Sequence, residues 1–149
     1  MNKNNKWFAS WFDSPHYHIL YKHTDYKEAE FFLKNLTDFL RPKKSDKILD
    51  LACGAGRHSI FLNSLGFDVT GVDLSPNSIE TANKLKNDRL KFDVHDMREV
   101  YQDEGFNFVF NMFTSFGYFD SNEENIKMIQ SIEKTLKTEG VFVLDFFNA

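Results

Sequence analysis

The sequence predicts an α/β fold, a doubly wound and mostly parallel sheet with the strand order 3-2-1-4-5 and helices on both faces. Short apolar runs alternate along the chain with segments whose apolar residues recur every three or four positions. The first run leads into a glycine pair, Gly54 and Gly56, and the second run ends on an acid, Asp73. In such sheets a ligand binds beyond the carboxyl ends of the strands, so both features are candidates for a binding site.

The first predicted helix covers residues 26–40, because its apolar residues have helical spacing and Pro42 follows it. Its buried stripe is expected to contain Ala29, Phe32, Leu33, Leu36 and Leu40. A strand at 48–51 and the glycine turn come next, followed by a helix that Gly66 caps at its carboxyl end.

The rest of the chain repeats this alternation. The pattern predicts, in order, a strand at 67–73, a helix at 77–87, strands at 90–94 and 105–113, a helix from Asn122 and a strand at 141–147. The inward positions expected on the two helices are Ile79, Ala82 and Leu85, then Ile126, Ile129, Ile132 and Leu136. Gly140 is expected beyond the end of the last helix.

Length and composition predict one domain, since the chain has 149 residues, of which 42% are hydrophobic and 27% charged. Within it we expect an aromatic segment and helix at 1–42 and a ligand-binding core at 43–149. The formal net charge of −4 lacks the basic surplus that binding to nucleic acid requires, so no such partner is expected.

Cysteine content and hydropathy predict a cytoplasmic location without membrane insertion. Cys53 has no second cysteine to pair with, and no apolar run reaches the roughly 18 residues of a membrane span. The residues after Met1 contain no apolar core of signal-peptide length. Cys53 lies between a strand and two glycines, where we expect it to pack as a small hydrophobe rather than to act as a nucleophile.

The residues around the glycine pair indicate which ligand binds. A dinucleotide fingerprint has a third glycine at the position of Ser59, and it accommodates a pyrophosphate. Here Asp50 stands four residues before Gly54, where a carboxylate repels a pyrophosphate and suits a positively charged ligand. Asp73 can accept both hydroxyls of a ribose, and Ser75 is available to cap the next helix in its place.

The stretch Asp50-Leu-Ala-Cys-Gly-Ala-Gly56 resembles the first motif of the class I S-adenosylmethionine-dependent methyltransferases, and Gly71-Val-Asp-Leu-Ser75 resembles their next motif. The resemblance covers essentially the whole chain. It implies a Rossmann-like fold, S-adenosylmethionine as cofactor, and an enzyme that transfers a methyl group to a small-molecule nucleophile. The cofactor-binding residues that it implies are Asp50, Ala52, Gly54, Gly56, Asp73, Leu74, Asp96, Met97, Asn111 and Phe113.

The resemblance also implies roles around the adenine ring. Asp96 would accept the adenine amino group, and the backbone of Met97 would bind the edge of the ring. Asp93 and His95 are alternative polar residues, but we expect strand alternation to point both away from the face of Asp96.

Polar and aromatic residues elsewhere are candidates for the substrate side. Thr114, Ser115 and Tyr118 follow the fourth strand and are candidates for substrate contact, although turn formation explains Ser115 equally well. Tyr17 and Tyr21 would either form a lid over the cofactor or pack on the flank of the domain. No catalytic residue is assigned, and no metal is expected, because His16, His18 and His23 have no further ligands at familiar spacing.

Members of this family continue into two further strands, so the chain is expected to be truncated after its fifth strand. An apolar strand left at the edge of a sheet can pair with a second copy, which makes a homodimer possible. Two alternative functions remain at this point: a cofactor-binding domain without catalysis, and an NAD(P)-binding oxidoreductase domain. The missing third glycine and Asp50 count against the oxidoreductase.

Overall fold

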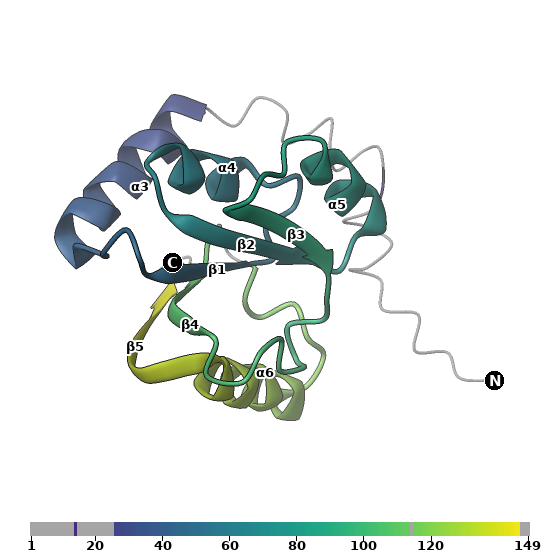
Figure 1. The fold of residues 1–149 in the computed structure, drawn as a ribbon. Helices are drawn as coiled ribbons and strands as arrows, with labels where there is room; N and C mark the ends of the chain where they lie inside the picture. The colour runs from purple at the N-terminus through teal and green to yellow at the C-terminus, as the bar shows by residue number, and fades with distance from the viewer. Residues whose placement is uncertain (1–13, 15–25, 114, 147–149) are drawn as a thin grey trace.

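The computed structural model describes residue 14 and residues 26–113 and 115–146, and these form a parallel α/β sheet (Figure 1). The elements, in chain order, are α3 (Tyr26–Leu40), β1 (Lys47–Leu51), α4 (Arg57–Ser64), β2 (Asp68–Asp73), α5 (Pro76–Asn83), β3 (Leu90–Val94), β4 (Phe106–Asn111), α6 (Asn122–Thr135) and β5 (Leu136–Leu144). The strands pair in the order β3-β2-β1-β4-β5, and every pair is parallel. The predicted fold class and strand order are therefore confirmed.

The sheet is covered on both faces, with α3, α4 and α5 on one side and α6 on the other (Figure 1). On the first face Leu33 of α3 and Leu62 of α4, both fully buried, pack with Phe110 of β4. On the second face Met128 and Ile132 of α6 pack against apolar residues of β1, β2 and β4. Strands buried on both faces explain why the central runs of the sequence are almost continuously apolar.

Side chains at the helix ends agree with the capping signals in the sequence. The Ser75 hydroxyl accepts a hydrogen bond from the Ser78 amide at 3.2 Å, which caps α5 as predicted. Gly66 lies just past α4 with φ of +93°, and its amide donates to the Asn63 carbonyl. With Ser75 as the cap, Asp73 is not needed for that role.

Several residues predicted to face the core are exposed instead. Phe32 is 41% exposed, because α3 buries a narrower stripe through Ala29 and Leu33. Leu85 is 59% exposed, because α5 ends at Asn83, four residues earlier than the pattern predicts. Ile79 and Ala82, the other inward positions predicted on α5, are buried.

The buried stripe of α6 is also rotated from the predicted one. Ile126 and Ile129 are exposed, whereas Ser131 and Thr135 are buried beside Met128. Both hydroxyls donate hydrogen bonds to backbone carbonyls, so their burial leaves no donor unsatisfied. Hydrophobic periodicity alone could not identify these polar residues as core positions.

The last strand begins earlier than predicted. β5 starts directly after α6 at Leu136, not at residue 141, and it contains Gly140. Leu136 pairs with Phe106 and Val141 pairs with Phe108, so the six residues 136–141 of β5 lie opposite the three residues 106–108 of β4. This irregularity takes up the segment that the sequence pattern predicts as the end of a helix and a connecting turn.

Some predictions fall on residues outside the described ranges, namely those for Tyr17, Tyr21, Thr114 and the N-terminal histidines. Within residues 26–113 and 115–146, no group of three or more His, Cys, Asp or Glu side chains is placed to hold a metal ion. In the same part of the chain, no helix is both long and apolar enough to cross a membrane.

Candidate functional site

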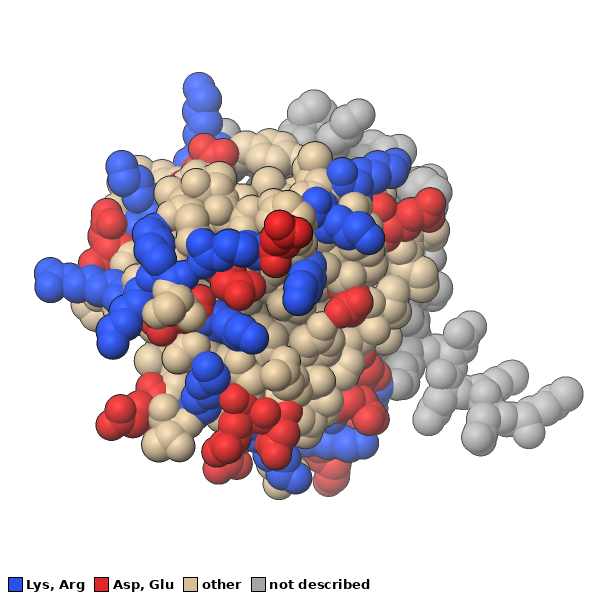
Figure 2. Space-filling model, in the orientation of Figure 1, with Lys and Arg blue, Asp and Glu red and all other residues tan. Residues whose placement is uncertain are grey.

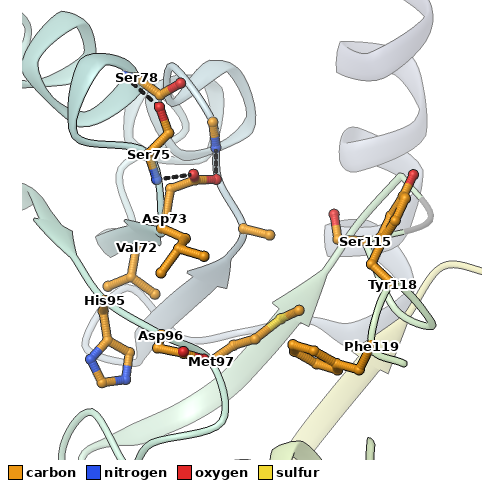
Figure 3. A pocket seen from close by; sticks show the side chains of 13 residues that line it. Val72, Asp73, Ser75, Ser78, His95, Asp96, Met97, Ser115, Tyr118 and Phe119 are labelled. Atoms are coloured by element: carbon orange, nitrogen blue, oxygen red, sulfur yellow. Dashed lines mark hydrogen bonds between the residues drawn. The ribbon is translucent and has the colours of Figure 1, made fainter. Parts of the chain in front are cut away.

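A cavity opens at the carboxyl ends of β1, β2 and β3, where the strand order predicts a ligand (Figure 3). Its wall consists of the turn after β1, the tip of β2 with the start of α5, the loop after β3, and the loop between β4 and α6. The predicted site residues in this wall are Ala52, Gly54, Asp73, Leu74, Asp96, Met97, Ser115 and Tyr118. The structure thus brings together residues that are up to 66 positions apart in the sequence.

The turn after β1 exposes its backbone to the cavity. Ala52 and Gly54 both have positive φ, at +59° and +56°, so the chain bends sharply at the end of the strand. A Cβ atom added at Gly54 would meet no atom of the described residues within 4 Å. The missing side chain therefore leaves open space on the cavity side, where a ligand can approach the main chain.

Asp73 connects this turn to the tip of β2 (Figure 3). One carboxylate oxygen, Oδ2, accepts a hydrogen bond from the Gly54 amide at 2.8 Å, and the other, Oδ1, accepts from the Ser75 amide at 2.8 Å. These two amides hold the acid at the cavity wall as a negatively charged acceptor.

Asp50 lies beneath the turn and is not part of the cavity wall. Its side chain is 1% exposed, and its Oδ2 accepts a hydrogen bond from the Ser59 hydroxyl at 2.6 Å. Burial raises the pKa of Asp50 to about 7, against the lowering effect of the Ser59 hydrogen bond. Any effect of this acid on a ligand must therefore act through the turn.

Gly56 also lies outside the cavity wall, and it is needed for packing. It precedes α4 with φ of +83°, and a Cβ atom there would lie 2.6 Å from Cε1 of Phe92. The Phe92 ring also lies against Gly71 of β2, where a Cβ atom would be 2.7 Å from both the ring and the Ser59 hydroxyl. In a dinucleotide fold a glycine on the helix allows this close approach. Here Gly71 on the strand allows it, and Ser59 occupies the helix position.

The loop after β3 places Asp96 and Met97 in the wall, as the resemblance implies. His95 also lines the cavity, but its ring lies edge-on to Tyr101, with 5.2 Å between the ring centroids. The expectation that it points away from the face of Asp96 stays a prediction. β3 ends at Val94, so the strand alternation on which the expectation rests stops before His95. Asp93 is placed elsewhere and accepts a hydrogen bond from the Tyr101 hydroxyl.

The predicted residues at the tip of β4 do not reach the cavity wall. Asn111 is fully buried, and its Nδ2 donates to the Leu51 carbonyl at 3.2 Å. Phe113 has φ of +57° and stacks on the His58 ring at 4.8 Å between centroids. The Ser115 hydroxyl donates to the Met112 carbonyl at 3.1 Å, so it stabilises the turn as well as lining the cavity.

Two groups near the site are neutral in the folded protein at pH 7. Burial, reinforced by the charge of Arg57, lowers the pKa of His58 to about 4. Burial also raises the pKa of the Cys53 thiol, and its side chain is 7% exposed. A buried, protonated thiol is inert, in agreement with a packing role for Cys53.

Sequence reasoning missed several residues of the wall, namely Val72, Ser75, Ser78 and Phe119. Ser75 was expected only as a helix cap. Its place two residues after Asp73 could have indicated that it also lies at the site, because its amide donates to the Asp73 carboxylate. Val72 is the residue before Asp73 on β2. No motif distinguishes Phe119 from the other aromatic residues of its loop.

A family model described as a methyltransferase domain matches residues 42–149. The chain belongs to this family. It is 35% identical over 123 residues to the glycine/sarcosine N-methyltransferase of Aphanothece halophytica, with 79% of this chain and 45% of that protein covered. The chain spans less than half the length of the curated relatives it matches first.

Solved structures agree with the family. A S-adenosylmethionine-dependent methyltransferase from Clostridium acetobutylicum superposes with a TM-score of 0.71 at 25% identity, over 93% of this chain and 56% of that one. DesVI of Streptomyces venezuelae superposes with a TM-score of 0.72 at 28% identity, over 88% of this chain and 56% of that one. The resemblance, the Rossmann-like fold and S-adenosylmethionine as the family's cofactor are thereby confirmed.

The cavity of this methyltransferase-domain chain fits that cofactor. Gly54 leaves room beside the main chain, Asp73 and Asp96 supply acceptors, and Met97 supplies an apolar surface. None of the described residues in the wall is Lys or Arg, the side chains that commonly neutralise a pyrophosphate. This chemistry favours an adenosyl ligand without phosphate over a dinucleotide.

Proposed function

We propose that this chain is the cofactor-binding part of an S-adenosylmethionine-dependent methyltransferase that acts on a small-molecule nucleophile. The observation that carries the proposal is the placement of Asp73, which is fixed on the Gly54 amide at the edge of the cavity. In that position its carboxylate can accept the two ribose hydroxyls of an adenosyl group. Asp96 would accept the adenine amino group, and Met97 would pack on the ring.

When bound, S-adenosylmethionine supplies a methyl group that its sulfonium charge already activates. The protein's contribution is then alignment and the exclusion of water. Tyr118 and Phe119 would cover the side of the cavity opposite Asp73 (Figure 3). Ser115 and Tyr118 are the polar residues that the described part of the loop between β4 and α6 contributes to the cavity wall, and they remain candidates for contact with the substrate.

The acceptor atom that the relatives favour is nitrogen. The relative from Aphanothece halophytica is named a glycine/sarcosine N-methyltransferase. Another relative, from Streptomyces venezuelae, is named a dTDP-amino-sugar N,N-dimethyltransferase and is 30% identical. We therefore propose a small amine as the substrate class. A panel of primary and secondary amines, with matched alcohols and carboxylic acids, tests this by methyl transfer.

The first experiment is calorimetric titration of the purified protein with S-adenosylmethionine, S-adenosylhomocysteine and NAD. We expect micromolar binding of both adenosyl ligands and no binding of NAD. In Asp73→Asn the affinity should fall by about tenfold or more, because a charged acceptor is lost. Asp68→Asn, at the opposite end of β2, is the matched control and should bind like the natural protein.

The outcomes of this titration and of the acceptor panel together separate the three functions. Binding of NAD alone would overturn the methyltransferase proposal in favour of an oxidoreductase. Binding of the adenosyl ligands without turnover of any acceptor would favour a cofactor-binding domain without catalysis. Equal effects of the Asp73 and Asp68 substitutions would show that the ribose site is elsewhere.

The cytoplasmic location, the absence of a nucleic-acid partner and a homodimer through β5 stay predictions. Support for the second comes from Figure 2, in which Lys and Arg are interspersed with Asp and Glu on the face shown. Support for the third comes from the position of β5 at the edge of the described sheet. Sedimentation analysis with and without S-adenosylhomocysteine measures the oligomeric state.

A further inference from the structure

Arg98 is a buried cation directly behind the cavity wall. Its side chain is 9% exposed, and it follows the wall residues Asp96 and Met97 in the loop after β3. Its amide and its Nε donate to Oδ1 of Asp96 at 3.0 and 2.9 Å, and a terminal nitrogen donates to Oδ2. One guanidinium therefore holds both oxygens of the Asp96 carboxylate, an arrangement that also fixes its plane.

The other side of Arg98 contacts the opposite part of the wall. Its second terminal nitrogen is paired with Glu124, in the first turn of α6. The guanidinium carbon lies 4.9 Å from the centroid of the Phe119 ring, a cation–π distance. Asp96 and Phe119 both line the cavity, so one cation connects its polar wall and its aromatic wall.

The loop that carries Asp96 needs such a support. Its backbone is held just past the end of β3 at Val94, where the His95 amide donates to the Asp73 carbonyl at 2.9 Å. The Met97 carbonyl accepts a hydrogen bond from Ser131 of α6 at 2.6 Å, which fixes the backbone but not the Asp96 side chain. A short carboxylate side chain without a partner can rotate, and recognition by hydrogen bonds fails when the acceptor is misplaced.

We propose that Arg98 is a positioning residue that orients Asp96 toward the amino group of a bound purine. This inference rests on the proposed function and adds a residue and a selectivity to it. A carboxylate held in this orientation accepts from a 6-amino group and repels the oxygen of a 6-oxo group. Arg98 thereby sets the preference of the cavity for adenosyl over inosyl ligands without contacting either.

The test compares S-adenosylhomocysteine with its 6-oxo analogue, S-inosylhomocysteine, by calorimetric titration of the full chain. The natural protein should prefer the adenosyl ligand by about tenfold or more, the effect of one charged hydrogen bond. In Arg98→Met this preference should fall to about threefold or less, because both guanidinium hydrogen bonds to Asp96 are lost. Loss of a merely structural residue would lower the affinities for both ligands equally and leave the ratio of the two affinities unchanged.

Arg98→Lys is the second variant, for the case in which Arg98→Met does not fold. It keeps the charge, so Asp96 and Glu124 retain a cationic partner. An ammonium cannot hold both carboxylate oxygens in one plane, so the preference should still fall below half of its natural value. Lys127→Met removes the exposed ion pair between Lys127 of α6 and Glu99 of the loop after β3, and it is the matched control. It should leave both affinities unchanged.

The outcomes distinguish this inference from the proposed function. If the natural protein binds no adenosyl ligand, the proposed function fails and this inference fails with it. If the natural protein binds and prefers the adenosyl ligand, but Arg98→Lys keeps the full preference, only the positioning role of Arg98 is overturned. A loss of preference in Lys127→Met would equally overturn it, since the effect would then not be specific to Arg98.

Discussion

The carboxylate of Asp73 accepts a hydrogen bond from the amide of Gly54 at 2.8 Å and so joins the tip of β2 to the turn after β1. The same side chain accepts from the Ser75 amide at the start of α5. Both bonds are made within the protein itself, and they hold the glycine turn in a shape that leaves the cavity open. A site that is formed in advance avoids the entropic cost of ordering the turn upon binding.

The amide of Gly54 should be protected from hydrogen exchange in the ligand-free protein. Asp73→Ala removes the acceptor, so we expect this amide to exchange about tenfold faster or more, as measured by NMR. Asp68→Ala, on the same strand, serves as the control and should leave the Gly54 rate unchanged. Equal protection in all three proteins would contradict the proposed rigidity of the turn.

Gly56→Ala should destabilise the fold by about 3 kcal/mol. The alanine would have to adopt a positive φ, and its methyl group would collide with Phe92. Chemical denaturation measures the loss. Phe92→Leu in the same chain should recover part of it by making room, which a double-mutant cycle detects. If the two substitutions add without coupling, the contact with Phe92 is not the cause.

Gly54→Ala should affect binding more than stability. The backbone at Gly54 also has positive φ, which costs about 1 kcal/mol for alanine, but the methyl group meets no atom in the part of the chain that the structure describes. It projects into the space available to a ligand, so the dissociation constant for S-adenosylhomocysteine should rise by about tenfold or more. A variant with natural affinity would show that the ligand does not approach this backbone.

Asp50→Asn should change the pH dependence of stability. The pKa of Asp50 is about 7 in the folded protein, whereas the ordinary value of 3.8 applies to the unfolded chain. Folding therefore takes up a proton at any pH between these two values. The free energy of unfolding of the natural protein therefore decreases as the pH rises from about 4 to 7, by up to about 4 kcal/mol from this group. Asparagine should remove this part of the slope, as urea denaturation at several pH values measures. Parallel curves for the two proteins would contradict it.

Much of the fold could be predicted because its signals are local. The alternation of apolar runs and helical stripes indicated every described strand, and Gly66 and Ser75 marked helix ends correctly. The errors occur where tertiary contacts decide how deeply a side chain is buried or where a helix or strand ends. Ile126 and Ile129 follow a perfect helical period, but the neighbours of α6 bury Ser131 instead, because its hydroxyl can reach the Met97 carbonyl.

The candidate site could be predicted only in part, for a related reason. Motifs placed Gly54, Asp73 and Asp96 correctly at the cavity, since each lies at the end of a strand. They could not separate Gly54 from Gly56, because the role of Gly56 depends on Phe92, which is 36 positions away. The contacts of Arg98 with Glu124 and Phe119 are equally invisible in the sequence, because they depend on how α6 packs on the sheet.

The ring of Phe92 fits between two backbones that lack side chains, one in the turn at Gly56 and one in β2 at Gly71. The glycine turn is therefore not a portable loop. Transferring residues 50–59 to another sheet would move the motif without the Phe92 ring, which sets the distance of the turn from the neighbouring strands. A graft that keeps its shape must also include Gly71 and Phe92, so the smallest transferable unit is a discontinuous one drawn from three adjacent strands.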